Sequence, residues 1–518
     1  MTLDARADAD RLVAGRPVAG LRASELLPGS DILDRRAYER TVRLLRDRAI
    51  RLPTFAELAT GQPDAPGHLA TVDPDAPDPD NLGRIHWYNG RSRRDRIPVP
   101  AHVVLPKQMT GVDAPIVVLL GALFPMIHSH KLLAAYACLV PRLATGRFDP
   151  TTQRAVWPST GNYCRGGVAL SRVLGCRGVA VLPEGMSEER FRWLEAWVTD
   201  PADIVRTPGS ESNVREIYER CEELARDPAN VVLNQFAEFG NHVVHRVVTG
   251  RAIEHAFEAF AERRPSARLA AFVAASGSAG TLGAGDYLKE RHGTRIAVAE
   301  AVECPTLLRN GFGEHNIQGI GDKHVPLIHN VLNTDFVVGV SDRATDQLSV
   351  LANSTAGRAW LADEAGVPDD VIATLELFGL SSLCNVVAAI KTAKHYRLGE
   401  DDVIATVATD GAAMYRSEHA KVLRRDFGGE FTDRDASRVF GQHLLGVDDA
   451  DTLELTLAER TRIFNLGYFT WVEQRGVSIE AFSERARPAF WQDLASLSGE
   501  WDEAIGRLNE DVALGATR

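Results

Sequence analysis

Lys131 is the residue whose type and position most clearly suggest chemistry. Lysine is rare here, because seven lysines stand among 58 basic residues and arginine supplies the rest. Lys131 lies in the stretch MIHSHKLLAAY, between the apolar run at 114–127 and a second apolar stretch. Two interpretations stay open from these residues. Either the lysine extends its amine to solvent from a helix start, or the amine is kept to attack a carbonyl, which arginine cannot do.

Three other stretches place polar or small residues where predicted strands end, the usual position of ligand sites in parallel sheets. WPSTGNYCRGG carries a turn at 159–162 that suits a carboxylate, although an ordinary helix cap explains it as well. GSAGTLGAGDY carries small residues at 277–281 that suit either a phosphate or a tight strand–helix turn, and it matches no standard nucleotide-binding motif. VIATVATDGAA ends in Thr409 and Asp410, where a helix cap is the simple interpretation.

The elements that must position these residues alternate between strands and helices. Strand-like segments follow one another from about residue 100, namely APIVVLL, GVAVLP, VVLNQF, LAAFVAAS, RIAVAEA and VIATVAT. Helical segments such as NVREIYERCEELARD lie between them, which predicts parallel sheets covered on both faces. We therefore predict an α/β fold with an N-terminal extension at 1–100 that includes a Pro- and Asp-rich loop, a core at 101–428, and a C-terminal helical extension at 429–518.

Composition argues against several classes of function. The 518-residue chain has a formal net charge of −12 and 45% hydrophobic residues, which indicates a large core and no affinity for nucleic acid. The first residues lack the apolar segment of a secretory signal, and the run at 114–127 is too short to span a membrane. The six cysteines are scattered, so we expect buried reduced thiols in a cytoplasmic protein. His242 and His245 form a pair without other ligands nearby, so no metal site is predicted.

Taken together, the four stretches resemble the fold-type II pyridoxal-phosphate enzymes, such as the cysteine synthase and tryptophan synthase β-like proteins, and most of all the cysteine synthase family. The segments LPEGMSEERFRWLEAW, NQFAEFGNHVVHRVVTGRAIEH and HNIQGIG share this resemblance, which keeps the family's order and approximate spacing over about residues 105–425. The resemblance implies two lobes, each built on a parallel sheet, with the smaller lobe around 135–250 and pyridoxal 5'-phosphate between the lobes. It also implies a homodimer whose small-molecule substrate is an amino acid.

The resemblance assigns roles to individual residues. It implies that Lys131 binds the cofactor covalently and moves the α-proton of the substrate, with Ser129 completing the family's Ser-x-Lys pattern. It implies that Asn162 holds the ring hydroxyl oxygen of the cofactor. The other residues implied are Gly277, Ser278, Ala279, Gly280 and Thr281 for the cofactor phosphate, and Ser159, Thr160, Gly161 and Gln235 for the substrate.

Several features depart from the family pattern. Ser278 and Ala279 stand where the family favours threonine and glycine, extra segments precede and follow the core, and the segment at 335–380 is longer than expected. At the late strand end the family usually presents a hydroxyl to the pyridine nitrogen, and the alignment places Asp410 there with Thr409 beside it. A carboxylate would stabilise a protonated nitrogen. We therefore expect Asp410 to contact the nitrogen, with contact by Thr409 as the alternative.

The resemblance implies a lyase or transferase that eliminates or replaces a β-substituent of an L-amino acid through an aminoacrylate. A deaminating dehydratase or desulfhydrase is the alternative, in which water consumes the aminoacrylate instead of a second nucleophile. A catalytically weak subunit that binds amino acids is a third interpretation, against which Lys131 and the phosphate loop argue. The sequence identifies neither the amino acid nor the nucleophile.

Overall fold

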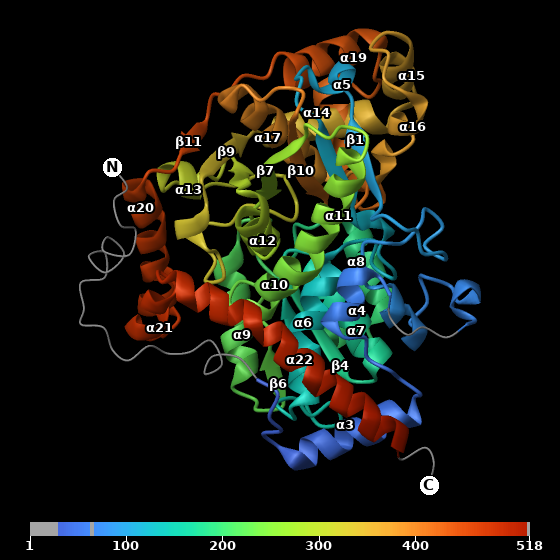
Figure 1. Ribbon diagram of the computed structural model, residues 1–518, viewed down its shortest axis with the longest axis vertical. Helices are drawn as coiled ribbons and strands as arrows, with labels where there is room; N and C mark the ends of the chain where they lie inside the picture. Colours follow the sequence, from blue (N-terminus) through green and yellow to red (C-terminus); the bar gives the residue numbers. More distant parts are fainter. Residues whose placement is uncertain (1–28, 63–66, 515–518) are drawn as a thin grey trace.

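Two sheets organise the protein. The computed structural model describes residues 29–62 and 67–514, so residues 1–28 of the predicted N-terminal extension lie outside the described residues. In Figure 1 the larger sheet occupies the upper half of the molecule and the smaller sheet the lower half. The α/β fold expected from the strand–helix alternation is therefore present, as are the two lobes that the resemblance implies.

Within the described residues, the larger sheet has seven strands in the spatial order β1 (His102–Leu105), β2 (Ile116–Leu120), β10 (Asp402–Ala408), β7 (Arg268–Ala275), β8 (Arg295–Ala301), β9 (Phe336–Val340) and β11 (Thr452–Glu454). The central strands β2 to β9 run parallel, and β1 and β11 pair antiparallel at the two edges. Strand β10 lies beside β2 although they are far apart in the sequence, so the residues that follow both strands meet at one edge.

Helices cover both faces of this sheet. Alternate residues of β8 show this, since Ile296 and Val298 join one apolar core and Ala297 and Ala299 join another. On the first face lie α11 (Gly250–Ala261) and α12 (Leu282–His292), and on the second lie α14 (Asp342–Asn353), α17 (Leu380–Tyr396) and their neighbours α15 (Thr355–Asp363), α18 (Arg416–Phe427) and α19 (Asp433–Phe440). Short helices join them: α5 (Lys107–Thr110), α13 (Thr306–Arg309) and α16 (Asp369–Ile372).

The smaller sheet is parallel throughout. In the described part of the chain it has four strands, in the order β5 (Ile204–Thr207), β4 (Arg177–Pro183), β3 (Arg154–Pro158) and β6 (Asn230–Val232). Its helices are α6 (Lys131–Ala144), α7 (Asn162–Leu174), α8 (Glu188–Trp197), α9 (Val214–Ala225) and α10 (Phe239–Val244). The predicted strands APIVVLL, GVAVLP, LAAFVAAS, RIAVAEA and VIATVAT are confirmed as β2, β4, β7, β8 and β10. The segment VVLNQF is a strand only at Val231 and Val232, where β6 ends.

The helices at the two ends of the described chain pack against both lobes. Before the core lie α3 (Arg35–Asp47) and α4 (Phe55–Thr60), and after it lie α20 (Leu457–Tyr468), α21 (Ile479–Glu484) and α22 (Pro488–Leu514). The long helix α22 crosses the molecule in Figure 1 and packs on α6, α10, α3 and α4. Its Trp501 ring lies 5.6 Å from the Phe55 ring, and the Trp471 indole N–H donates to the Val325 carbonyl (2.7 Å). The extension predicted to be helical thus belongs to the folded core.

Two predictions from composition can be compared with the structure. All six cysteines are buried and free, as predicted: Cys138, Cys164, Cys176, Cys221, Cys304 and Cys384. Among the helices of residues 29–62 and 67–514, none has the length and apolar character to cross a membrane.

Candidate active site

Lys131 is the first residue of α6, directly after the connection from β2. Met126 and His128 in this connection have left-handed backbone angles (φ 61° and 52°), a conformation that costs energy for non-glycine residues and is common at functional sites. The Lys131 backbone N–H donates to the Ser129 hydroxyl (3.3 Å), and the Lys131 amine donates to the Ser278 hydroxyl (3.0 Å). Burial lowers the pKa of the Lys131 amine to about 8. A substantial fraction of this amine is therefore neutral, and nucleophilic, at neutral pH.

A small cavity lies around the Lys131 side chain, between the two lobes. Its lining residues are Lys131, Ser159, Thr160, Asn162, Tyr163, Gln235, Phe236, Gly277, Ser278, Gly319, Asp322 and Thr409. The predicted residues Gly161, Ala279, Gly280, Thr281 and Asp410 do not line it. The structure thus brings the four motifs together, although they are up to about 280 residues apart in the sequence.

The turn at 159–162 connects β3 to α7. The Ser159 hydroxyl accepts a hydrogen bond from the Gly161 N–H (3.0 Å), which folds the turn back on itself. Gly161 has φ 153°, and a Cβ atom there would collide with the side chain of Arg190. Glycine is therefore required at this position. The Ser159 and Thr160 side chains reach the cavity at the N-terminal end of α7, where backbone amides and hydroxyls favour an anionic group.

The loop at 277–281 connects β7 to α12. A Cβ atom on Gly277 would lie 2.7 Å from the Gly319 carbonyl oxygen, so the loop makes a close approach that glycine permits. The Ser278 hydroxyl accepts from Lys131 and also from the Asn241 amide (3.0 Å). Ala279 has φ 64°, an unfavourable angle that glycine would tolerate. The first amides of α12 have no partner inside the helix, so this loop suits a phosphate.

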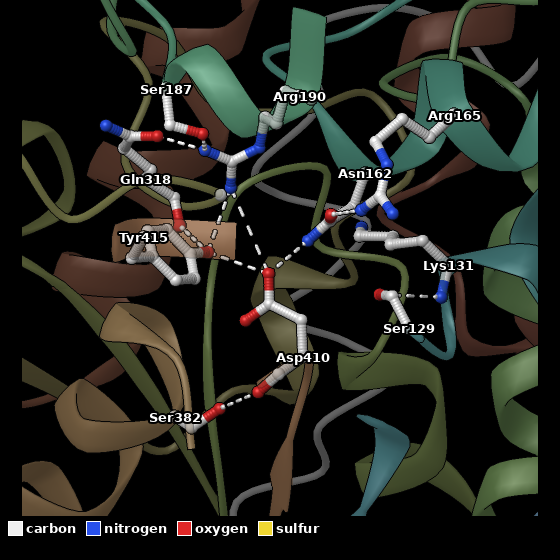
Figure 2. A network of polar contacts seen from close by, with 12 residues as sticks. Ser129, Lys131, Asn162, Arg165, Ser187, Arg190, Gln318, Ser382, Asp410 and Tyr415 are labelled. Atoms are coloured by element: carbon white, nitrogen blue, oxygen red, sulfur yellow. Dashed lines mark hydrogen bonds and ion pairs between the residues drawn. The ribbon is translucent and has the colours of Figure 1, made fainter. Parts of the chain in front are cut away.

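Asp410 lies at the centre of a buried network, outside the cavity (Figure 2). Its Oδ2 accepts from the Asn162 amide (2.6 Å) and from the Tyr415 hydroxyl (2.7 Å), and Arg190 lies 3.9 Å away. Its Oδ1 has no hydrogen-bond partner in the described part of the chain and packs against Gly379, away from the cavity. Burial raises the pKa of Asp410, while Arg190, Asn162 and Tyr415 act in the opposite direction.

Thr409 is the residue of this pair that lines the cavity. The expectation that Asp410 contacts a cofactor ring is not favoured by the geometry, because the Asp410 carboxylate is already held by its neighbours. Asp410 instead orients the Asn162 side chain, whose oxygen accepts from Arg165 (3.0 Å). The alternative, contact by Thr409, fits the arrangement.

Four further residues near the cavity were not singled out in the sequence. Arg190 and Tyr415 lie within motif segments, but nothing in their spacing indicates that they meet. Asp322 follows HNIQGIG directly. Its position beside a segment that resembles the family could have marked it as a candidate site residue. Glu211 lies in the stretch TPGSESNV, which carries no recognisable motif.

Comparisons with known proteins agree with this site. A model of the family described as "Pyridoxal-phosphate dependent enzyme" matches residues 104–410, more than half of the chain. The chain is 31% identical over 291 residues to a probable cysteine synthase of Bacillus subtilis, which covers 56% of this chain and 84% of that relative. It is 30% identical over 266 residues to a cysteine synthase of Staphylococcus aureus, which covers 51% and 75%. These matches confirm the resemblance found in the motifs.

Solved structures share the fold. The cysteine synthase of Entamoeba histolytica matches with a TM-score of 0.51 at 21% identity, covering 66% of this chain and 93% of that chain. The O-acetylserine-dependent cystathionine β-synthase of Helicobacter pylori matches with a TM-score of 0.50 at 23% identity, covering 64% and 95%. The predicted fold class is therefore confirmed.

Proposed function

Because the chain belongs to the family of pyridoxal-phosphate dependent enzymes, we propose that it eliminates or replaces the β-substituent of an L-amino acid, as a cysteine synthase-like enzyme. One observation carries this proposal. The amine of Lys131 donates to Ser278, so an amine and an anion-binding loop meet in one cavity. Deamination, in which water takes the place of a second nucleophile, is the alternative outcome at the same site.

The residues of the cavity fit pyridoxal phosphate. The buried Lys131 amine matches its aldehyde, and the loop at 277–281 matches its phosphate, since a Cβ atom at Gly277 would fill the space beside Gly319. Asn162 would hold the ring hydroxyl oxygen, and Thr409 the ring nitrogen. When bound, the cofactor withdraws electrons from the α-carbon of the amino acid.

The remaining residues act on the substrate. Ser159, Thr160 and Gly161 would bind its carboxylate at the N-terminal end of α7, and Gln235 would line the pocket opposite them. Lys131 would take the α-proton, a role that suits an amine whose pKa lies near 8. The network of Asp410, which binds Asn162, would hold that side chain at the ring position.

Location and assembly form part of the proposal. The free, buried thiols support a reducing compartment, so the protein is proposed to be cytoplasmic. A homodimer is proposed from the family resemblance, and sedimentation analysis of the purified protein tests it. Its proposed ligand is an amino acid, which is a small molecule. Neither nucleic acid nor a membrane is proposed as a partner.

Borohydride reduction followed by peptide mapping tests the proposal. We expect the purified protein to carry the cofactor, and the reduced pyridoxyl group to appear on Lys131. A label on Lys107 or Lys323, or protein that binds no cofactor, would refute the assignment. A panel of amino acids with thiol, sulfide and amine nucleophiles, analysed by product mass, then separates replacement from deamination.

A further inference from the structure

Asp322 is an acidic residue of the cavity that the proposed mechanism does not use. It lies in the loop between α13 and β9 and lines the cavity together with Lys131, Thr160 and Gln235. The residue is 7% exposed, and its Oδ2 has no hydrogen-bond partner among residues 29–62 and 67–514. A buried carboxyl oxygen without a partner is costly, so such a group usually has a functional reason.

Glu211 is a second acidic residue beside the same loop. It lies between β5 and α9 and is 1% exposed. Its Oε1 accepts from the backbone N–H of Gly319 (2.7 Å), a residue that lines the cavity, and its Oε2 has no hydrogen-bond partner within the described chain. Asp322 therefore belongs to the segment at 319–322, and Glu211 binds the first residue of that segment.

The surroundings favour the protonated form of both groups. Burial raises the pKa of Glu211 to about 7, against the opposing effects of Arg190, the Thr160 hydroxyl and the Gly319 amide. Burial raises the pKa of Asp322 well above its usual range, the negative charge of Glu211 adds to this, and Lys131 opposes it. Other ionisable groups that interact with this pair are Asp410, Tyr415, Tyr218 and Cys304. The surroundings of the pair therefore favour the binding of a proton by these two carboxyl groups.

The position of the pair relative to the proposed substrate indicates what this proton does. If the turn at 159–162 binds the carboxylate and Lys131 faces the α-carbon, these residues occupy two sides of the cavity. Among the described residues that line the cavity, Asp322 alone is acidic. It is therefore the lining residue that can exchange a proton with the β-substituent.

We propose that Asp322, supported by Glu211, is the proton donor and acceptor for the β-substituent, and that the enzyme therefore acts on L-amino acids whose β-substituent is a hydroxyl or a thiol. This inference rests on the proposed β-elimination or β-replacement. Hydroxyl and thiol groups leave as neutral molecules only if they receive a proton, whereas an acyloxy group leaves as a stable carboxylate without one. An acidic residue in the cavity can protonate a departing hydroxyl or thiol group. It offers no positive charge to a departing carboxylate.

The proton balance of the step is complete. The Lys131 amine takes the α-proton, the Cβ–O or Cβ–S bond breaks, and its electron pair stays with the departing atom. Asp322 gives that atom a proton, so water leaves from a hydroxyl substituent and hydrogen sulfide from a thiol substituent, and the acidic pair is left with one proton fewer. In the replacement direction, the Asp322 carboxylate takes a proton from the incoming nucleophile as its bond to Cβ forms.

Selectivity between leaving groups tests this role. For the holoenzyme and its Asp322→Asn variant, kcat/KM is measured with L-serine, L-cysteine and O-acetyl-L-serine. We expect the variant to lose about 100-fold or more with serine and cysteine, and to change little with O-acetylserine. Asp322→Glu, which keeps the carboxyl group, should restore part of the lost activity. Glu300→Gln is the matched control, because Glu300 is a buried carboxyl group with a pKa of about 7 that lies outside the cavity.

A second measurement does not depend on turnover. Infrared difference spectra record the protein with and without L-alanine, which has no β-leaving group. We expect a protonated-carboxyl band that responds to alanine in the wild type and in Glu300→Gln, and that is absent in Asp322→Asn.

The outcomes distinguish this inference from the proposed function. An equal loss of activity with all three substrates in Asp322→Asn, or a carboxyl band that ignores alanine, would overturn the role of Asp322. If the wild type carries cofactor on Lys131 but turns over none of the amino acids, the proposed function fails, and the infrared band still decides whether Asp322 holds a proton that faces the substrate.

Discussion

The cavity has two walls that treat buried acidic groups differently. The motif wall comprises Lys131, the strand ends at 159–162 and 277–281, and Thr409, with Asp410 behind Thr409. In this wall the Asp410 carboxylate accepts hydrogen bonds from two side chains, and Arg190 lies nearby. The loop wall comprises Gly319 and Asp322, with Glu211 beside Gly319. Glu211 accepts one backbone hydrogen bond, and among residues 29–62 and 67–514 no cationic side chain forms an ion pair with Glu211 or Asp322. Burial thus does not determine the role of a carboxyl group. A paired carboxylate holds its neighbours in place, whereas an unpaired one is available for proton transfer.

Asp410→Asn tests the motif wall and has the largest expected effect on stability. The substitution removes the negative charge opposite buried Arg190, and breaking a buried ion pair typically costs about 3–5 kcal/mol. We expect a loss of this size in the free energy of unfolding, measured by urea denaturation. Asp401→Asn is the control, because Asp401 pairs with Arg264 on the surface and such pairs contribute little. Equal losses in the two variants would mean that Asp410 is not a structural centre.

Glu211→Gln has the opposite expected sign and tests the loop wall. The pKa of Glu211 is raised from 4.5 to about 7, so the folded protein holds a proton that the unfolded chain releases. The stability due to this proton is complete below pH 4.5 and is lost as the pH rises through 7. Glutamine removes the cost of the buried charge, so the variant should be more stable by about 3 kcal/mol at pH 8.

Urea denaturation at pH 4 and pH 8 checks this sign. The wild type and Glu211→Gln should differ little at pH 4 and most at pH 8. A variant that is less stable than the wild type at pH 8 would show that Glu211 is charged and satisfied, as Asp410 is.

The two walls also differ in how far the sequence predicts them. Lys131, the turn at 159–162 and the loop at 277–281 each follow a strand, and parallel strands bring such ends to one edge. Local signals therefore suffice for this wall, and they predicted the strands and the fold class as well. The roles of the individual residues stay predictions.

The loop wall has no comparable signal. Asp322 and Glu211 lie in irregular segments. These segments meet through the Gly319 amide and through the hydroxyls of Ser210 and Ser212, and such contacts depend on packing between elements about 100 residues apart. The sequence does not decide between Thr409 and Asp410 for the same reason. Both follow β10, and only the side chains of Asn162 and Tyr415, which bind Asp410, indicate which one is outside the cavity.

Thr160→Ala sharpens the comparison within the motif wall. If the Thr160 hydroxyl binds the carboxylate of the substrate, its loss should weaken amino-acid binding by about 1.5–3 kcal/mol, while cofactor binding stays unchanged. Spectroscopic titration of the holoenzyme with L-alanine measures both. Thr392→Ala is the control, because the Thr392 hydroxyl bonds to the Ala388 carbonyl inside α17, away from the cavity. Unchanged affinity of Thr160→Ala for the amino acid would show that the turn serves only as a helix cap.

Ala279→Gly has the smallest expected effect and concerns the backbone of the motif wall. Ala279 holds φ 64°, a left-handed angle that costs an L-residue about 1–2 kcal/mol. Glycine relieves this cost but gives the unfolded chain extra freedom, worth about 0.4–1 kcal/mol, so the net gain in the free energy of unfolding should be about 0.5 kcal/mol. Ala284→Gly, inside α12, should instead lose about 1 kcal/mol, because it carries the helix cost without strain to relieve. Urea denaturation of the pair checks the difference in sign. A loss in Ala279→Gly equal to that in Ala284→Gly would show that the loop is not strained, and that alanine suits this turn as well as glycine does.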